Sequence, residues 1–301
     1  MLLDAAATEV TAALRRSQIP SRLLKGAALA AWLYDGADRT YVDVDLLVAP
    51  SDLERVEKVL EQLGFSPADG AAPRADRPRH ARVWEREGDA AVVDLHTTLA
   101  GVGIAPQEAW DVLVTAVDET VVGGEAVETL DVPARALHVV LHAAQHGTRS
   151  PQALADLERA LDRLPLETWR ESEALARRLD ALPAFFAGLS LSTEGEAVAR
   201  RLGLSSVSSV EADLRVGVAR EEILGSALGF EWLAGARGVR QKAAFVATKV
   251  APPPAWMKRR SALARRGYGG LVAAYMLRLG RLAPHTVAGF WAWRRARRAA
   301  R

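Results

Sequence analysis

The hydrophobic positions of the first half of the chain alternate between two spacings. Over residues 2–16, apolar side chains return every three or four positions, which predicts an amphipathic helix. Residues 21–24 form a short extended segment, and a helix is expected from Gly26 to Tyr34. Residues 41–48 alternate with a period of two, which predicts a strand. Residues 51–63 return to the helical spacing.

Two further strands are expected at residues 80–87 and 91–99, joined by the tight-turn pair Gly88-Asp89. A second hairpin is expected at 121–127, around Gly123-Gly124. After Pro133 the pattern is helical almost to the end of the chain. Mixed elements followed by helices alone predict an α+β fold with a mainly helical C-terminal region.

This order predicts three parts: a catalytic domain over 1–132, a helical domain over 133–250 and a basic helical segment over 251–301. Consecutive prolines at 252–254 mark the last boundary. Half of the 301 residues are apolar, which is enough for a sizeable core.

The composition excludes several classes of site. With no cysteine, the chain has no disulfide scaffold, thiolate zinc site or cysteine nucleophile. The N-terminus lacks the basic and apolar regions of a signal peptide. The longest apolar stretch, 268–293, is interrupted by Arg278, Arg281 and Pro284, so we expect no transmembrane helix. These features predict a cytoplasmic protein.

Three aspartates suggest a metal site. Asp43 and Asp45 are two residues apart on an expected strand, so both side chains leave one face of the sheet. Asp94 lies on a later strand, and if the strands are neighbours the three carboxylates converge. Their mutual repulsion requires a cation, and hard oxygen ligands suit Mg²⁺ or Mn²⁺. A pair of such ions can activate an attacking oxygen and stabilise a leaving pyrophosphate.

Other polar residues near these aspartates have more than one interpretation. A glycine at a helix start, in Lys25-Gly26-Ala27, leaves backbone N–H groups open to a phosphate. Arg39 either clamps phosphate or orients a carboxylate, or it forms an ion pair with Asp35 or Asp38. His96 shares the face of Asp94, either as a partner of the metal ligands and proton acceptor or as a hydrogen-bonded core residue.

These residues together resemble the uncharacterised nucleotidyltransferase family of the polymerase-beta-like superfamily. The similarity extends over about residues 1–160, and the segments that carry it are Leu24-Lys25-Gly26-Ala27-Ala28, Arg39, Asp43-Val44-Asp45-Leu46-Leu47-Val48 and Asp94-Leu95-His96.

The resemblance implies a mixed sheet with flanking helices, with metal bound by Asp43, Asp45 and Asp94. It implies transfer of a nucleoside monophosphate from a nucleoside triphosphate, ATP above all, to an acceptor that is a small molecule, peptide, protein or RNA. In the wider superfamily a serine that touches phosphate usually follows the turn glycine, and here that position is Ala27. The positive charge of Lys25 can compensate for the missing serine hydroxyl.

A stripe of histidines and a basic C-terminus complete the candidate features. His138, His142 and His146 recur every four residues on one helix face, and we interpret them as a polar seam facing the cleft or the second domain rather than as a zinc site. Residues 258–301 hold twelve basic and no acidic side chains, whereas the other 257 residues hold 27 basic and 37 acidic ones. We expect this tail to dock internally, burying Trp291 and Trp293, with weak contact to an anionic surface.

Two other functions remain open at this point. One is a catalytically silent binding protein on the same fold, because Ala27 lacks the phosphate-touching hydroxyl. The other is an adaptor for a membrane or RNA, whose function resides in the basic tail.

Overall fold

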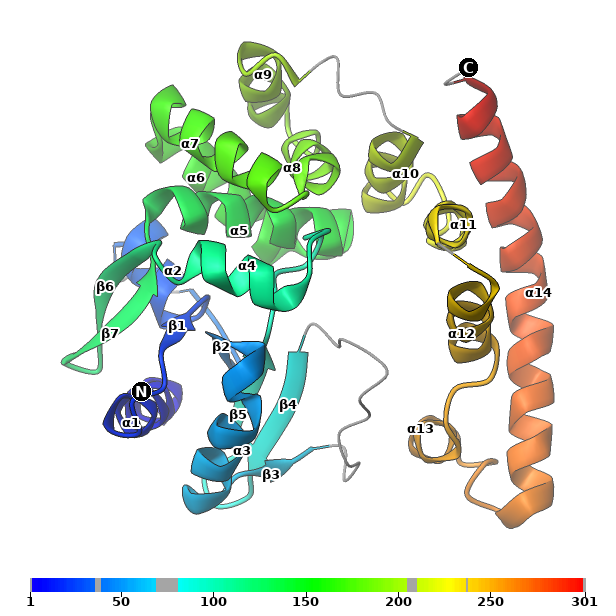
Figure 1. Ribbon diagram of the computed structural model, residues 1–301, viewed down its shortest axis with the longest axis horizontal. Coiled ribbons are helices and arrows are strands. Elements are labelled where there is room, and N and C mark those ends of the chain that lie inside the picture. The colour runs from blue at the N-terminus through cyan, green and yellow to red at the C-terminus, as the bar shows by residue number, and fades with distance from the viewer. Residues whose placement is uncertain (1, 36–38, 69–80, 205–209, 237, 300–301) are drawn as a thin grey trace. The chain divides into compact units, whose positions relative to one another are not determined.

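The computed structural model divides into two compact units, residues 1–206 and 207–301 (Figure 1). The helices from residue 132 to residue 201 belong to the same compact unit as the sheet. The three-part division at 132/133 and 250/251 stays a prediction. The residues that the structure describes are 2–35, 39–68, 81–204, 210–236 and 238–299.

The described strands of the first unit form one seven-stranded mixed sheet, as predicted. Their bounds are β1 (Ser21–Leu23), β2 (Val44–Val48), β3 (Ser66–Pro67), β4 (Ala81–Arg86), β5 (Ala91–His96), β6 (Val117–Val122) and β7 (Glu125–Leu130). The order across the sheet is β3-β4-β5-β2-β1-β7-β6. The pairs β2–β5 and β1–β7 are parallel, and the other pairs are antiparallel.

Helices and two short 3₁₀ turns complete the first unit. They are α1 (Leu2–Arg16), α2 (Ala27–Leu33), η1 (Pro50–Asp52), α3 (Leu53–Gln62), α4 (Pro106–Leu113), α5 (Val132–His146), η2 (Gly147–Arg149), α6 (Pro151–Arg163), α7 (Leu166–Arg178), α8 (Leu182–Leu189) and α9 (Thr193–Arg201). The helix predicted over 2–16 is confirmed.

The period-two pattern of β2 and β5 separates an apolar face of the sheet from a polar one. Val44, Leu46 and Val48 of β2 pack in one core cluster with apolar residues of α1 and α3. Val93 and Leu95 of β5 belong to the same cluster. The side chains between them on each strand therefore point to the opposite face.

The strand expected at 41–48 begins later than predicted. β2 starts at Val44, and Val42 is 78 % exposed rather than packed in the core. The pairing explains the difference, because β5 pairs with residues 44–47 and β1 with residues 46–48. Before residue 44 the Tyr41 hydroxyl donates a hydrogen bond to Asp4 of α1 instead.

Both predicted hairpins are confirmed. Residues 87–90 form the turn between β4 and β5, and His80, the first residue of that predicted strand, lies outside the described residues. Gly123 and Gly124 join β6 to β7, with φ of 58° and 89°. Two successive positive φ angles are typical of the hairpin turns that glycine favours.

Helix α5 is the centre of the helical part of the first unit. It packs against α6, α7 and α8, and its residues are buried from Ala134 to Leu141. Asp131 caps its start by accepting a hydrogen bond from the Ala134 N–H at 3.0 Å. The histidine stripe therefore lies on a helix that is buried on most sides.

The second unit is entirely helical in its described part. Its elements are α10 (Val210–Ala219), α11 (Ser226–Gly235), α12 (Val239–Val250), α13 (Pro254–Arg260) and α14 (Gly267–Ala299). The long helix α14 packs against α10, α11 and α13. Among the described helices, none is both long enough and apolar enough to cross a membrane.

The tail docks internally, but of its two neighbouring tryptophans Trp293 is partly buried and Trp291 is exposed. Trp293 donates from Nε1 to Glu231 of α11 at 2.7 Å, and Arg297 forms an ion pair with the same carboxylate. Trp291 is 51 % exposed and Trp293 is only partly buried, so the expectation that both indoles are buried is wrong. Positions 291 and 293 are 200° apart on a helix and cannot share one buried face.

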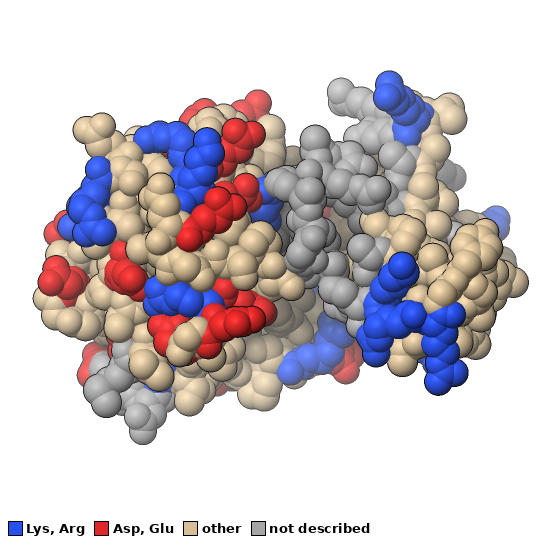
Figure 2. Space-filling model, turned by 90° about the horizontal axis from the view of Figure 1, so that it is seen from below, with Lys and Arg blue, Asp and Glu red and all other residues tan. Residues whose placement is uncertain are grey.

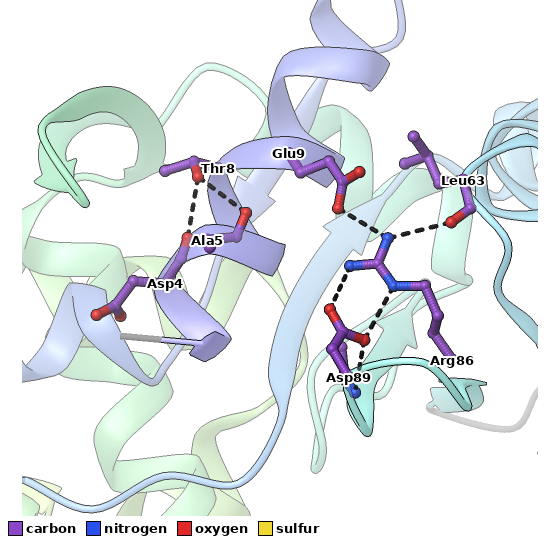
Figure 3. A network of polar contacts seen from close by, with 8 residues as sticks. Asp4, Ala5, Thr8, Glu9, Leu63, Arg86 and Asp89 are labelled. Atoms are coloured by element: carbon purple, nitrogen blue, oxygen red, sulfur yellow. Dashed lines mark hydrogen bonds and ion pairs between the residues drawn. The ribbon is translucent and has the colours of Figure 1, made fainter.

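The side chain of Arg86 connects the β4–β5 hairpin to α1 and to the end of α3, which pack on the apolar face of the sheet (Figure 3). Its guanidinium binds the Asp89 carboxylate through two hydrogen bonds of 3.0 and 2.7 Å. It also donates to Glu9 of α1 at 2.8 Å and to the Leu63 carbonyl after α3 at 3.1 Å. The same group lies 4.5 Å from the ring centre of Phe65. One side chain thus joins the β4–β5 hairpin to both helices that cover the sheet.

We expect Arg86→Leu to lower the free energy of unfolding by about 1.5–3 kcal/mol, because the variant loses charge-assisted hydrogen bonds on three elements. Urea denaturation followed by circular dichroism measures this change. Arg170→Leu is the matched control, since Arg170 forms an ion pair with Glu167 on the exposed surface of α7. Equal effects of the two substitutions would contradict a linking role for Arg86.

Candidate functional site

The polar face of the sheet carries three ligand-type side chains on two neighbouring strands. The Cα of Asp45 on β2 lies opposite that of Asp94 on β5. His96 Nε2 lies 3.0 Å from Asp45 Oδ1 and 3.6 Å from Asp94 Oδ2. Within the described part of the chain, these residues are the one group of three potential metal ligands, with one ligand atom of each inside 4.8 Å of the others.

Asp45 is buried and charged. Its residue exposure is 1 %, and Lys25 Nζ lies 2.7 Å from its Oδ1. Burial opposes ionisation of this carboxyl, but the hydrogen bond from His96 and the charge of Lys25 outweigh it and hold the pKa well below its usual range. The Leu24 N–H donates to the Asp45 carbonyl at 2.9 Å, which keeps the Lys25 turn beside the strand.

The negative charges of Asp43 and Asp94 are less well compensated than that of Asp45. Burial, followed by repulsion from Asp45, raises the pKa of Asp43, and burial raises the pKa of Asp94 with a further contribution from Asp45. The Oδ1 atom of Asp94 is buried and has no hydrogen-bond partner within the described chain. A divalent cation would satisfy this oxygen and relieve the repulsion, so the residues present fit Mg²⁺ or Mn²⁺.

The structure therefore brings Asp45 and Asp94 together as the sequence predicts. Asp43 stands just before β2, and its carboxylate interacts electrostatically with both but is not part of the compact group of three. His96 takes the third place in that group. The sequence signal for this role was the spacing of two residues between His96 and Asp94. The His96 ring forms a hydrogen bond directly with Asp45 and does not lie in the apolar core.

The turn at Lys25–Ala27 requires its glycine. Gly26 has φ of 62°, and a Cβ atom there would lie 3.3 Å from the ring of Tyr41. A residue with a side chain would be strained in this conformation and crowded against that ring. Ala27 is the first residue of α2, directly after this turn.

Arg39 is held by a carboxylate far along the chain. Its Nε and Nη2 atoms donate to Asp156 of α6 at 2.9 and 2.6 Å, and both side chains are buried. Tyr34 and Gln152 also donate to Asp156, at 2.8 and 3.1 Å. Burial disfavours the charged form of Asp156, but the hydrogen bonds and charge of Arg39 outweigh it and lower its pKa.

The ion pair of Arg39 with Asp156 is not the pair with Asp35 or Asp38 that the sequence suggested as one alternative. Asp35 binds Arg163 instead, through two hydrogen bonds of 2.9 and 2.5 Å, and Asp38 lies outside the described residues. Arg39 orients a carboxylate, but one on α6 rather than one of the three aspartates. No local spacing signals this contact, since the partners are 117 residues apart.

The histidine stripe faces the same site from α5. The rings of His138 and His142 are 6.2 Å apart, and those of His142 and His146 are 4.5 Å apart. Burial, followed by the charge of Lys25, holds the pKa of His138 well below its usual range and lowers that of His142 to about 3. Both rings are therefore neutral at pH 7 and interact electrostatically with Asp45 and Lys25, which agrees with a polar seam.

Comparison with known proteins places the chain in a family. A family model described as "Uncharacterised nucleotidyltransferase" matches residues 1–194. The chain belongs to this uncharacterised nucleotidyltransferase family. The match includes the whole sheet and helices α1–α8, so every residue of the candidate site lies within the family region. No curated protein matches the chain by sequence.

Similar solved structures include two of the antibiotic-resistance factor ANT(2'')-Ia. The solution structure is 18 % identical, covers 60 % of this chain and 94 % of its own, and has a TM-score of 0.43. The crystal structure with adenylyl-2''-tobramycin is 17 % identical, covers 58 % and 97 %, and has a TM-score of 0.43. An antigenic nucleotidyltransferase-like protein from Paracoccidioides brasiliensis is 15 % identical, covers 66 % and 96 %, and has a TM-score of 0.37.

In this nucleotidyltransferase-family chain, Asp156→Asn should lower the free energy of unfolding at neutral pH by about 3–5 kcal/mol, because Arg39 loses its buried counter-charge. The folded-state pKa of Asp156 is lowered, so its stabilisation is complete above the unfolded value of about 4 and is lost as pH falls through the folded value. Urea denaturation at several pH values should show the difference from the parent chain shrinking below about pH 4. Asp35→Asn, at an exposed pair, should leave the midpoint unchanged.

The buried imidazole of His142 predicts a second pH dependence in a different range. Its folded pKa of about 3 lies below the unfolded value of about 6.5, so the unfolded chain binds more protons between these values. Stability should therefore fall by about 1–2 kcal/mol between pH 7.5 and pH 5 through this residue. His142→Gln should flatten that part of the curve. An equal slope in parent and His142→Gln would contradict the assignment.

Proposed function

We propose that this protein is a metal-dependent nucleotidyltransferase that moves a nucleoside monophosphate from a nucleoside triphosphate, ATP above all, to an acceptor hydroxyl. The observation that carries the proposal is the pairing of Asp45 with Asp94 across adjacent parallel strands, with Asp94 Oδ1 buried and unpartnered in the described chain. Membership of the nucleotidyltransferase family supports the class of reaction.

The proposed reaction exchanges a phosphoanhydride bond of the triphosphate for a phosphoester bond to the acceptor. The acceptor oxygen forms a bond to the α-phosphorus while the bond from that phosphorus to the bridging oxygen breaks, and pyrophosphate leaves with the electron pair. Asp94 receives the hydroxyl proton as general base and passes it to water.

Asp43, Asp45 and Asp94 are the residues that would hold Mg²⁺ or Mn²⁺, which when bound supplies Lewis-acid stabilisation of charge on the phosphates. His96 orients Asp45 through its 3.0 Å contact. The ammonium group of Lys25 forms an ion pair with Asp45 Oδ1, and its charge compensates for the phosphate-binding hydroxyl that Ala27 lacks. The triphosphate is assigned to the Lys25–Ala27 turn, and Arg39 fixes the segment that leads into Asp43 through its bond to Asp156.

Asp45→Asn and Asp94→Asn should each lower nucleotidyl transfer by about 100-fold or more, because metal stabilisation of transition-state charge is worth several kcal/mol. Release of pyrophosphate with each of the four nucleoside triphosphates and Mg²⁺ measures the activity. Asp162→Asn, on the exposed side of α6, is the matched control and should retain activity.

Metal binding is measured independently of activity by thermal unfolding. An ion at ten times its Kd stabilises the folded chain by about 1.4 kcal/mol, and this gain should be lost in Asp45→Asn. Unchanged transfer in both aspartate variants would refute the assignment. A chain that is stabilised by Mg²⁺ and nucleotide but turns over none of the four would instead be the silent binding protein.

A further inference from the structure

Helix α14 presents an apolar line to the outside of the second unit. Exposed apolar side chains occur along most of its length: Tyr268, Val272, Met276, Leu277, Leu279, Val287 and Trp291. At 100° per residue, four of the five aliphatic side chains fall within an arc of about 80°, and Leu277 lies about 80° beyond it. Ala274 and Gly289, on the opposite side of the helix, are the buried positions. The exposed line is therefore a second apolar face, separate from the one that packs against the unit.

Basic residues bracket this line at both ends. Arg265 and Arg266 precede the helix, and Arg294 and Arg298 follow Trp291 with exposed side chains. Arg294 falls inside the same arc as the aliphatic residues, and Arg298 lies about 20° beyond it. Over the second unit, at the right of Figure 2, blue side chains are separated mainly by tan surface. Residues 258–301 contain twelve basic and no acidic side chains.

We propose that the outer face of α14 docks on an anionic lipid bilayer, with the helix parallel to the membrane plane. A helix of 33 residues is about 50 Å long, and a line of apolar side chains along one side of it matches a flat surface. The apolar residues enter the boundary of the acyl chains while the arginines bind lipid phosphates. This inference does not rest on the proposed nucleotidyl transfer.

Other occupants fit the same face less well. A nucleic-acid backbone would pair with the arginines, but it gives no reason for aliphatic side chains such as Met276 and Val287 to be 65 % and 59 % exposed. A second copy of this helix would bring two rows of arginines together without an acidic residue to pair with them. Only a partner that is both apolar and anionic complements the whole surface.

Co-sedimentation of the full chain with vesicles tests the proposal. Vesicles of phosphatidylcholine mixed with phosphatidylglycerol should bind the protein, and pure phosphatidylcholine vesicles should bind it at least tenfold more weakly. Arg294→Gln with Arg298→Gln should weaken binding by about 30-fold, since each basic residue at an anionic surface contributes about fivefold. Arg200→Gln with Arg201→Gln removes two exposed arginines from the end of α9 and should leave binding unchanged.

A second pair of substitutions tests the apolar contribution without changing charge. Met276→Gln with Val287→Thr alters exposed side chains only, and we expect about tenfold weaker vesicle binding with unchanged thermal unfolding. Tryptophan emission should shift to shorter wavelength on binding, and Trp291→Phe should reduce that shift. These readouts do not depend on nucleotidyl transfer, so either hypothesis can fail alone.

Three outcomes would overturn the proposal. Equal binding to neutral and anionic vesicles would remove the role of charge, and full binding by the Met276→Gln, Val287→Thr variant would remove the role of the apolar line. Binding to single-stranded RNA at physiological salt, in the absence of vesicle binding, would replace the bilayer with a nucleic acid.

Discussion

The buried charge of Asp45 is the constraint on which the candidate site depends. An ionised carboxylate that is 1 % exposed is costly unless cationic or hydrogen-bonding partners surround it. Lys25 comes from the turn after β1, and His96 comes from the neighbouring strand β5. The pairing of three adjacent strands is therefore what makes this charge tolerable. The same pairing places Asp94 beside Asp45, where its own charge is opposed by burial and repulsion.

Asp156 is also a buried carboxylate, but its oxygens have a different set of partners. Its two carboxylate oxygens accept hydrogen bonds from Arg39, Tyr34 and Gln152, so its charge is fully engaged within the protein. Asp94 differs because one buried oxygen has no partner in the described chain. A saturated carboxylate holds the fold together, whereas an unsaturated one retains capacity for a ligand. The cluster of Asp45, Asp94 and His96 on the sheet is thus consistent with a divalent-metal site, whereas α6 positions Arg39 through Asp156.

The sequence predicts the faces of the sheet better than the ends of its strands. Period-two alternation correctly separates Asp45 from the core residues Leu46 and Val48, because alternation is a local property of an extended chain. The start of β2 at Val44 depends on how far β1 and β5 extend, which no local pattern encodes. The partner of Arg39 was missed for the same reason, since a contact across 117 residues is set by packing of α6.

Charged side chains are paired differently in the two units. In the first unit, buried acidic groups at Asp45 and Asp156 are each matched by a nearby cation. In the second, Glu231 pairs with Arg297, but α14 itself contains no acidic residue and cannot form stabilising pairs one turn apart. Its attachment therefore relies on apolar contacts such as those of Phe290 and Trp293 with Phe230 of α11. A helix held by apolar contacts on one side leaves the exposed Arg294 and Arg298 on the other, where they can meet an external anion.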